Sequence, residues 1–244
     1  AYMARVAPLS PDVIHVSHAF EGLGQRVALP TRAALAPGQI LSATLYDLIP
    51  LVFPEHYFQD ETFRLWYHQR LAWMRDADLL LAISEASRQD AIARMGIEPW
   101  RVVTIGGGIS DHFRPFKGGA AKREREKKQL ARRYGLNRRF AVYTGGDDFR
   151  KNIAGAIRGF AAVPPSQRAD WCLVIVCAME PHRQDMYRDI AKAAGLDHAS
   201  LIITGFVPEE DLVAFYQHCD LLVFPSLYEG LGFPVLEGMA CGAP

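Results

Sequence analysis

The 244-residue sequence lacks an excess of charge of either sign, because 27 lysine and arginine side chains balance 27 aspartates and glutamates. Nucleic-acid-binding domains usually carry a basic excess, so this balance argues against a nucleic-acid partner. The sequence also lacks an apolar run of about 20 residues, the length that a membrane-spanning helix needs. Its apolar runs, such as Leu79–Ile83 and Leu221–Phe224, have the length of strands instead.

Cysteine is scarce, and the sequence opens without a signal peptide. The four cysteines show no CxxC spacing of the kind that binds zinc, and such scatter is typical of a reducing compartment. Residues Ala1–Arg5 do not form the basic and then apolar pattern of a secretory signal. Half of the residues are hydrophobic, as in an ordinary packed protein. We therefore expect a soluble, cytoplasmic α/β chain of the size of an enzyme.

Short β-branched runs alternate with longer segments of helical period, which predicts βα units and parallel sheets. Several of these runs are apolar throughout, as in sheets that helices cover on both faces. Strands are expected at Val13–Val16, Ile40–Leu45, Leu79–Ile83, Arg101–Ile105, Phe140–Tyr143, Cys172–Cys177, Ser200–Thr204 and Leu221–Phe224. Helices are expected at Glu61–Ala77, Glu85–Met95, Ile153–Val163, Arg183–Ala194 and Glu209–His218.

One segment, residues 117–139, interrupts this alternation with ten basic residues against two glutamates. Proline and glycine are frequent just before it, in Phe113–Gly119, which suits a domain boundary. We predict an N-terminal domain at residues 1–113, a basic linker at 114–137 and a C-terminal domain at 138–244. The linker has two interpretations: a solvated, mostly helical connector, or a segment that attaches the protein to an anionic membrane face.

Neither end of the sequence supplies what a complete doubly wound domain needs. No glycine-rich turn follows the first strand, and the sequence stops directly after an expected helix, at Cys241–Pro244. We therefore expect both domains to be incomplete.

The stretch Leu221–Pro244 carries the richest set of candidate ligand groups. A strand leads into a loop that holds Glu229 and two glycines, and Pro234 suits the first position of a helix that has Glu237 in its first turn. Glycine lets a backbone approach a ligand closely, and the N–H groups of a helix start bind phosphate or sugar oxygens. Carboxylates accept hydrogen bonds from diols, so the set suits a nucleotide sugar. A glutamate in a first turn also complements the helix dipole without any ligand.

A second candidate lies at Phe140–Asn152, where a strand ends in Gly145 and Gly146 and the pair Arg150 and Lys151 precedes a helix. Arginine offers a bidentate fork to phosphate oxygens, and lysine offers a point charge. The alternative is that the two residues are solvent-exposed and bind no ligand.

Metal ligands are not expected. Asp147 and Asp148 are interpreted as loop residues, because nothing nearby completes a divalent site. The eight histidines show no ligand spacing and are interpreted as packing or surface residues: His15, His18, His56, His68, His112, His182, His198 and His218.

Five blocks of the sequence, in order, resemble the group 1, family 4 glycosyltransferases. The E-x7-E pair of Glu229 and Glu237 resembles the signature of that family. A further block, "LYDLIPLVFPEHY", resembles the subgroup that builds bacterial surface polysaccharides, many of whose members use GDP-mannose. The five blocks are "LLLAISEASRQDAI", "VVTIGGGISDHFRP", "YTGGDDFRKNIAGAIRGFAAVP", "TGFVPEEDLVAFYQHCDLLVFPS" and "PSLYEGLGFPVLEGMACGAP".

The resemblance implies the GT-B architecture, an α/β fold of two Rossmann-like, doubly wound domains that face each other across a cleft. The nucleotide sugar would bind the second domain and the acceptor the first. The resemblance also implies a retaining hexosyltransferase that needs no metal and no other cofactor. Its donor would be a nucleotide sugar, with GDP-mannose favoured over a UDP-sugar, and its acceptor a glycan or a lipid-linked sugar of surface polysaccharide. A lipid-linked acceptor would bring the cytoplasmic protein to the inner membrane face.

The site residues of the family carry over to matching positions. Glu237 matches the ligand of the ribose diol, and Glu229 matches the glutamate near the transferred sugar. Asp47 matches the acidic member of a catalytic His-Asp pair on the acceptor side. The other matches are the backbone donors Gly230, Leu231, Gly232 and Phe233, the diphosphate ligands Arg150 and Lys151, and the cleft residues Gly145, Gly146, Ser84 and Glu85.

The sequence departs from the family pattern at three positions. Tyr46 replaces a frequent histidine, Gly107 replaces an asparagine, and Gly146 replaces an arginine. These changes leave the class intact and bear on the acceptor-side chemistry. Three other classes stay open: a GT-B-shaped sugar-nucleotide epimerase, a non-catalytic nucleotide-sugar-binding module, and a glycosidase, which would leave the basic diphosphate site unexplained.

Overall fold

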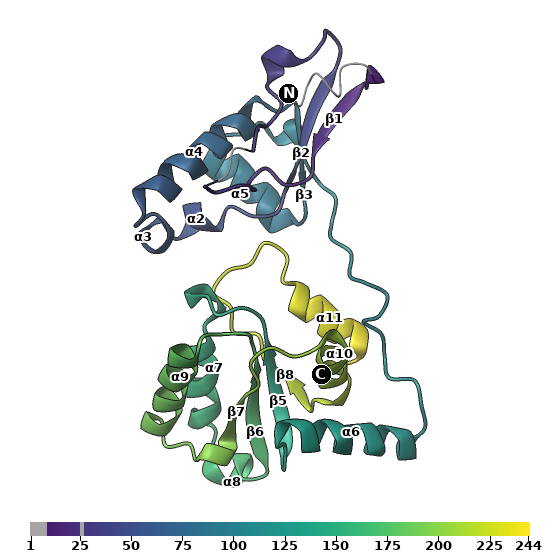
Figure 1. Ribbon diagram of the computed structural model, residues 1–244, viewed down its shortest axis with the longest axis vertical. Coiled ribbons are helices and arrows are strands. Elements are labelled where there is room, and N and C mark those ends of the chain that lie inside the picture. Colours follow the sequence, from purple (N-terminus) through teal and green to yellow (C-terminus); the bar gives the residue numbers. More distant parts are fainter. Residues whose placement is uncertain (1–8, 25–26) are drawn as a thin grey trace. The chain divides into compact units, whose positions relative to one another are not determined.

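The computed structural model describes residues 9–24 and 27–244 (Figure 1). The absence of a signal peptide was predicted from Ala1–Arg5, which lie outside the described residues. Among the described residues, no helix has both the length and the apolar content to cross a membrane.

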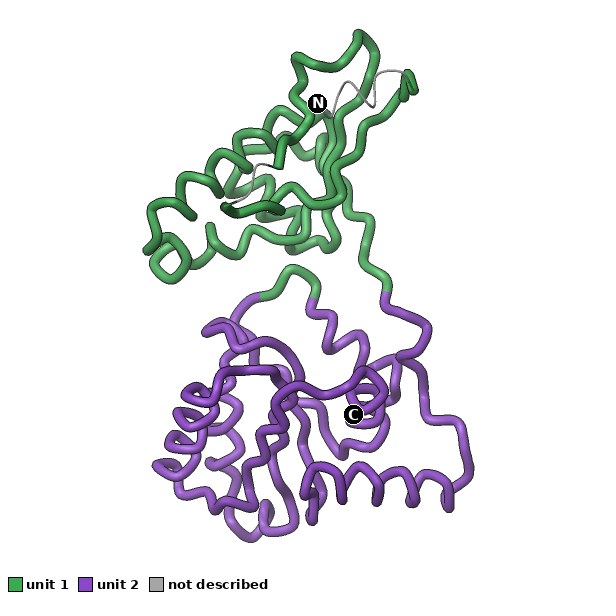
Figure 2. Tube along the Cα trace, viewed as in Figure 1, with its two compact units in different colours: residues 1–108, 229–231 green, residues 109–228, 232–244 purple. Residues whose placement is uncertain are grey.

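The chain divides into two compact units, each with its own four-stranded parallel sheet (Figure 2). Unit 1 comprises residues 1–108 and 229–231. Unit 2 comprises residues 109–228 and 232–244.

In unit 1, the strands pair in the order in which they occur in the sequence, β1-β2-β3-β4. The register places Val13 opposite Ile40 and Ser42 opposite Leu79. Each strand lies at the predicted position, to within one residue at either end. The bounds are β1 (Val13–Val16), β2 (Ile40–Leu45), β3 (Leu79–Ala82) and β4 (Val102–Thr104).

The two long helices of unit 1 begin at side-chain caps. The carboxylate of Asp60 accepts a hydrogen bond from the Phe63 amide at 2.7 Å, and the Ser84 hydroxyl accepts one from the Ser87 amide at 3.0 Å. Gly96 ends the second helix with a φ of +68°, a conformation that glycine adopts without strain. Two four-residue helices were not predicted, because they are too short to show a helical period. The bounds are α2 (Ile49–Val52), α3 (Pro54–Tyr57), α4 (Glu61–Asp76) and α5 (Glu85–Met95).

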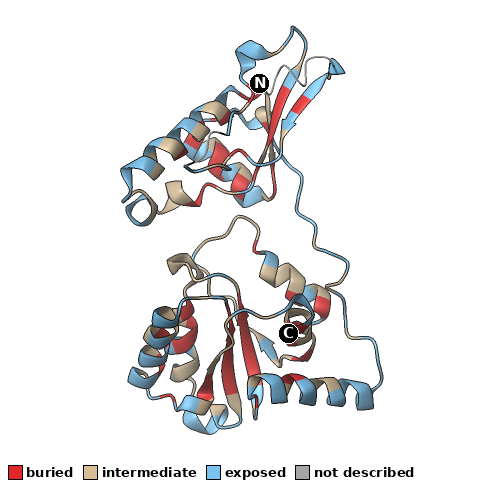
Figure 3. Ribbon diagram, viewed as in Figure 1, coloured by how far each residue is buried: buried red, intermediate tan, exposed pale blue. Residues whose placement is uncertain are grey.

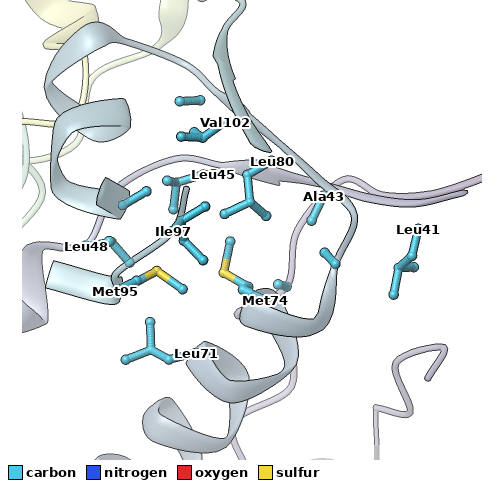
Figure 4. Packing of buried hydrophobic residues seen from close by; sticks show 14 of the residues in the cluster. Leu41, Ala43, Leu45, Leu48, Leu71, Met74, Leu80, Met95, Ile97 and Val102 are labelled. Carbon is cyan, nitrogen blue, oxygen red and sulfur yellow. The ribbon is translucent and has the colours of Figure 1, made fainter. Parts of the chain in front are cut away.

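The core of unit 1 forms where α4 packs against the sheet (Figure 4). Leu71 and Met74 of α4 pack in one cluster with Leu45 and Leu80 of the strands, and all four side chains are at most 1% exposed. Burying a side chain of this size contributes about 1.5–3 kcal/mol relative to leaving it exposed. This cluster therefore fixes the position of α4 on the sheet, and with it the position of the aromatic residues on the first two turns of α4.

In unit 2, the strand order is β7-β6-β5-β8, so the sequence direction across the sheet reverses at β5. The chain builds β5, β6 and β7 outward and then returns to add β8 on the other side of β5. The last strand spans only Leu221 and Leu222, two residues shorter than predicted, although the Val223 amide still donates to the Val142 carbonyl of β5 at 2.8 Å. The bounds are β5 (Arg139–Thr144), β6 (Trp171–Val176), β7 (Leu201–Ile203) and β8 (Leu221–Leu222).

Helices cover both faces of the unit 2 sheet, and β5 and β6 are therefore buried on both sides (Figure 3). On one face, Tyr143 packs in a cluster with Ile157 of α7. On the other face, Val142 packs in a cluster with Phe215 of α10. This alternation is what the continuous apolar runs predicted. The bounds are α6 (Ala120–Tyr134), α7 (Ile153–Ala162), α8 (Pro165–Arg168), α9 (Pro181–Ala193), α10 (Glu209–His218) and α11 (Phe233–Cys241).

The basic segment predicted as a linker at residues 114–137 contains α6, and α6 belongs to unit 2. Leu130 is buried in the unit 2 core, and Arg133 donates to both carboxylate oxygens of Asp211 on α10, at 2.8 and 2.6 Å. The second compact unit begins at Ile109, a few residues before the predicted end of the N-terminal domain at residue 113. Leu130 is the one residue of α6 that is fully buried, and ten basic residues surround it in the sequence. This is why the sequence predicted a solvated connector.

Candidate functional site

A pocket of about 250 Å³ lies in unit 2, where strands β5 and β6 end. Thr144 is the last residue of β5, Val176 is the last residue of β6, and both line the pocket. Parallel α/β sheets bind ligands outside the carboxyl ends of their strands, beside the point at which the strand order reverses. The lining residues are Thr144, Gly145, Val176, Cys177, Ala178, Gly205, Phe206, Val207, Leu212, Tyr216, Pro234 and Glu237.

Glu237 is held in this pocket by a chain of hydrogen bonds that joins three elements. The Tyr216 hydroxyl of α10 donates to Glu237 Oε2 of α11 at 2.9 Å. Since that hydroxyl proton is used, Thr144 Oγ1 of β5 donates to the Tyr216 oxygen, across 2.7 Å. Tyr216 is 1% exposed, and burial raises the pKa of its hydroxyl, so that it stays protonated. A carboxylate offers about four acceptor positions, so Glu237 keeps capacity for a ligand.

The prediction that Glu237 lies in the first turn of its helix was wrong. The helix begins at Phe233, after Gly232, and has no acidic residue in its first turn. Pro234 is correspondingly its second residue. The dipole of α11 therefore does not account for the position of this carboxylate in the helix. The hydrogen bond from the Tyr216 hydroxyl accounts for it instead.

Close packing of α11 depends on Gly238. A β-carbon at this position would lie 2.5 Å from Leu222 Cδ2 and 3.4 Å from Tyr216 Cδ1. The glycine thus lets α11 approach β8 and α10, which brings Glu237 within reach of the Tyr216 hydroxyl.

The two predicted glycines after β5 occupy different surroundings. Gly145 lines the pocket and has a φ of +148°, and a β-carbon there would lie 3.0 Å from the Tyr143 hydroxyl. Gly146 is exposed and does not line the pocket, and its carbonyl accepts a hydrogen bond from the same hydroxyl at 3.0 Å. The structure therefore requires glycine at position 145, whereas a β-carbon at position 146 would meet no atom within 4 Å.

Arg150 joins the two sequence segments that carry the predicted donor residues. Its guanidinium donates to the Tyr228 carbonyl at 3.2 Å and lies 3.6 Å from the Asp148 carboxylate, and the side chain is 17% exposed. The Leu227 amide donates to the Arg150 carbonyl at 2.7 Å. Arg150 is not among the residues that line the 250 Å³ pocket. It lies beside the loop between β8 and α11, so its surroundings differ from those of Glu237.

Asn152 reinforces the same connection, although no role was predicted for it. Its φ of +55° is uncommon outside glycine. The side chain caps α7 by accepting from the Gly155 amide at 3.1 Å, and it donates to the Pro225 carbonyl at 3.1 Å. Lys151 lies between Arg150 and Asn152 in the sequence, and its ammonium group is 5.5 Å from the centroid of the Phe224 ring. Asn152 therefore positions the basic pair against the β8–α11 loop.

The aspartates after β5 have structural partners. Asp147 accepts two hydrogen bonds from the Arg183 guanidinium, at 2.6 and 2.8 Å, and one from the Tyr187 hydroxyl at 2.7 Å. These bonds, the ones from Arg183 above all, lower the pKa of its carboxyl. Asp148 accepts from the Arg150 amide at 3.0 Å. No group of three or more His, Cys, Asp or Glu side chains that could hold a metal ion occurs among the described residues.

The predicted residues of the loop before α11 fall into both units. Glu229, Gly230 and Leu231 are grouped with unit 1, and Glu229 is half-buried. Gly232 and Phe233 belong to unit 2, where Gly232 precedes α11 with a φ of +79° and supplies no side chain to cap it. Gly232 therefore cannot satisfy the amides of the first turn of α11 with a side chain of its own.

Three further predicted residues lie in residues 1–108 of unit 1. Ser84 caps α5 through the Ser87 amide. Glu85 is exposed and accepts hydrogen bonds at 2.7 Å from both Gln89 and Thr104, and these lower its pKa. Asp47 lines a different pocket, where one of its oxygens accepts from the Ile49 amide at 3.1 Å. The structure thus assigns a helix-capping role to Ser84, while Asp47 faces a cavity.

Two family descriptions match the sequence and together cover almost all of it. Residues 122–244 match the family described as "Glycosyl transferases group 1", and residues 2–113 match "Glycosyltransferase Family 4".

Similar proteins include two mannosyltransferases and a protein solved in complex with UDP and glucose. The serotype-specific mannosyltransferase WbdA of Escherichia coli is 32% identical over 98% of this chain and 29% of its own length. The O-antigen chain mannosyltransferase B of Escherichia coli is 28% identical over 82% of this chain and 51% of its own length. HepE of Anabaena, solved with UDP and glucose, superposes with a TM-score of 0.66 at 20% identity, over 99% of this chain and 61% of its own. The chain therefore spans about three tenths to three fifths of these relatives.

Proposed function

Because the chain belongs to the group 1 glycosyltransferases and has their GT-B type of fold, we propose that it transfers a hexose from a nucleotide sugar to a glycan or lipid-linked acceptor. We favour mannose as the hexose and GDP-mannose as the donor, since WbdA and the O-antigen chain mannosyltransferase B are both named mannosyltransferases. The product would be a surface polysaccharide such as an O-antigen.

The hydrogen-bond chain from Thr144 through Tyr216 to Glu237 is the observation that carries the donor site. It holds a carboxylate at the edge of a pocket where the strand order of the sheet reverses. A ribose offers two adjacent hydroxyl donors, and a fixed carboxylate accepts from both. The base would lie between the ends of β5, β6 and β7, whose loops line the rest of the pocket.

Charge on the diphosphate would be stabilised by Arg150, Lys151 and the backbone amides at the start of α11. In a retaining transfer, the bond from C1 of the sugar to the diphosphate oxygen breaks as the acceptor oxygen bonds to C1 on the same face. The acceptor proton passes to the leaving phosphate. Negative charge grows on that phosphate, and preorganised positive groups stabilise it in the transition state. This chemistry needs no protein nucleophile and, in our proposal, no metal ion.

Glu229 would lie near the transferred sugar, with the backbone of Gly230 to Phe233 donating to sugar and phosphate oxygens. Asp47 would act on the acceptor side. Tyr46 stands where a histidine is frequent, and a phenol is a far weaker base than an imidazole at neutral pH. We therefore assign deprotonation of the acceptor to the leaving phosphate and not to this position.

A binding and turnover comparison tests the donor site. Glu237→Gln should weaken GDP binding by about 1–3 kcal/mol, the range for a hydrogen bond to a charged group. Glu210→Gln, an exposed glutamate at the start of α10, is the matched control and should bind as the parent does. Unchanged GDP affinity in Glu237→Gln would contradict the assignment.

Incubation with labelled GDP-mannose, UDP-glucose and a glycan acceptor separates the alternatives. Transfer to the acceptor supports the proposal. Epimerisation of the donor, or binding with no turnover, would favour the epimerase or the non-catalytic module, and release of sugar from a glycoside would favour a glycosidase.

We also propose that unit 2 touches an anionic membrane at the cytoplasmic side, through one face of α6. Arg125 and Arg132 lie along an exposed face of this helix. Six of the ten basic residues in the segment are instead paired with carboxylates: Lys122, Lys127, Lys128, Arg133, Arg138 and Arg139. The attraction is therefore smaller than the sequence suggests, at about 1 kcal/mol for each unpaired basic residue near the surface.

Vesicle sedimentation tests this contact. The protein should bind phosphatidylserine vesicles at low salt and release them near 1 M salt, where the Debye length is about 3 Å. Arg125→Glu combined with Arg132→Glu should abolish the binding, whereas Lys192→Glu on α9 should not. Equal binding to neutral vesicles would mean that α6 is only a solvated face.

A further inference from the structure

A connecting segment, residues 109–119, carries the chain into unit 2 and runs along α10 before α6 begins (Figure 1). Because this segment contains no helix or strand, its position depends on side-chain contacts. Four of its residues each contact one residue of α10, in the pairs His112 with Glu209, Phe113 with Tyr216, Arg114 with Gln217, and Phe116 with His218. Of these residues, only Tyr216 has a role in the proposed function.

His218, the last residue of α10, is buried without hydrogen bonds. Its side chain is fully buried, and neither ring nitrogen has a hydrogen-bond partner among the described residues. Glu126 Oε2 of α6 lies 4.0 Å from Nε2, beyond hydrogen-bond distance, and the Phe116 ring lies 5.3 Å from the imidazole ring. An imidazolium has two N–H donors and a charge that need partners, so this site accommodates the neutral ring and disfavours the cation.

The charges that face His218 come from α6 and do not compensate for its burial. Burial lowers the pKa of His218, and the positive charges of Arg123 and Lys127 lower it further. Glu126 and the dipole at the end of α10 act in the opposite direction, but the net shift is downward. The connecting segment contributes the Phe116 ring, and the Arg123 guanidinium also lies over this ring, at 5.3 Å. Protonation of His218 would therefore add a third positive charge beside Arg123 and Lys127.

We propose that His218 makes the attachment of the connecting segment depend on pH: the neutral ring packs against Phe116, and its protonation in mild acid releases the segment from α10. The inference rests on the proposed function in one step, the effect on the donor site. Phe113 meets the Tyr216 ring edge-on at 6.0 Å, and the Tyr216 hydroxyl holds Glu237 in the pocket. Release of the segment uncovers Tyr216. A nucleotide bound by Glu237 therefore favours the attached state, and acid opposes it.

The sign and size of the effect follow from the two states of His218. When the segment is released, water reaches the imidazole, which then has an ordinary pKa of about 6.5. In the attached state the pKa is lower, so attachment is unaffected above pH 6.5 and weakens as the pH falls below that value. Between pH 7.5 and 5.5, the ratio of released to attached segment should rise by up to about tenfold. His112 has the opposite sign, because its Nε2 lies 2.9 Å from Glu209 Oε1 and a proton there would strengthen the attachment.

Chymotrypsin cleavage after Phe113 and Phe116 measures the release, because the protease must take up a ring that packs on α10 in the attached state. The full chain is digested under native conditions at pH 7.5 and 5.5, and each rate is divided by that of a free peptide of residues 109–119. In the parent, this ratio should rise about fivefold to tenfold at the lower pH. In His218→Gln and His218→Phe, it should change less than about twofold, because no group titrates there. His198→Gln replaces an exposed histidine of unit 2 and is the matched control, which should behave as the parent does.

No rise in the parent, or the same rise in both His218 variants, would overturn the proposal. An NMR titration of the parent tests it without any variant. The His218 ring should titrate below the ordinary value of about 6.5, and titration at or above that value would also overturn the proposal.

A GDP experiment keeps this proposal separate from the proposed function. Saturating GDP should lower the cleavage ratio of the parent severalfold at pH 5.5, because the nucleotide favours the attached state. GDP binding without this protection would overturn the link between the connecting segment and the donor site. A pH effect on cleavage without any GDP binding would overturn only the proposed function.

Discussion

Replacing Tyr216 with phenylalanine removes one oxygen atom from the centre of the unit 2 site. That oxygen donates to Glu237 and accepts from Thr144, and it is the only link between these two residues that the structure gives for the described chain. The ring itself stays, so its packing against α11 and the core is preserved. The substitution therefore reports on the hydrogen bonds alone.

The expected loss of stability follows from the two bonds. A hydrogen bond to a charged group contributes about 1.5–3 kcal/mol, and a neutral one about 0.5–1.5 kcal/mol. Glu237 is half-buried and can recover part of its loss from water, so we expect a net cost of about 1–3 kcal/mol. At about 2–4 °C for each kcal/mol in a chain of this size, the melting temperature should fall by several degrees.

Donor affinity should fall as well, because the carboxylate is no longer held toward the pocket. We expect GDP to bind about 2–10-fold more weakly, the effect of losing one ordinary hydrogen bond. Calorimetric titration with GDP measures this directly, and a thermal melt without ligand measures stability.

Tyr187→Phe is the matched control. Tyr187 is also buried in unit 2 and donates to a carboxylate, that of Asp147, at 2.7 Å, but it does not line the pocket. It should lose similar stability and bind GDP as the parent does. If both variants lose GDP affinity equally, or if Tyr216→Phe loses none, the hydrogen-bond chain does not position the donor and our reasoning is refuted.

Three further predictions concern the loop after β5. Arg150→Ala combined with Lys151→Ala should weaken GDP binding much more than guanosine binding, because the pair would hold phosphate oxygens; equal losses in the two titrations would make the pair structural. Asp147→Asn should lower stability at neutral pH, and since Arg183 holds the pKa of Asp147 below its ordinary 3.8, the difference from the parent should shrink in melts as pH falls through and below that value. A difference that grows toward low pH would be inconsistent with that ion pair. Sugar transfer should continue in a metal chelator, and strict dependence on magnesium would contradict the metal-free mechanism.

Much of the fold could be predicted from the sequence because its signals are local. Short apolar and β-branched runs located all eight strands of the described residues. The α6 segment misled because its one buried leucine, Leu130, is outnumbered by charges, although those charges pair with unit 2 residues such as Asp211. Local composition cannot reveal a partner that lies 78 residues away along the chain.

The site shows the same limit more sharply. Glu237, Gly145 and Arg150 stand out by type and spacing, but their surroundings depend on Tyr216, Gly238 and Asn152, which look ordinary in sequence. Tyr216 resembles any buried aromatic residue of an amphipathic helix, and only the folded sheet shows that its hydroxyl reaches both Thr144 and Glu237.

The dependence of Glu237 on core residues couples donor binding to the stability of unit 2. A ligand that binds only the folded state stabilises it by about 2.7 kcal/mol at a concentration of 100 times its Kd. The Tyr216 hydroxyl contributes to the fold and to the proposed site at once, so its removal should lower both the melting temperature without ligand and the increase that GDP produces. Tyr187→Phe should lower only the first. A melt series over GDP concentration therefore separates a residue that holds the unit together from one that also shapes the pocket.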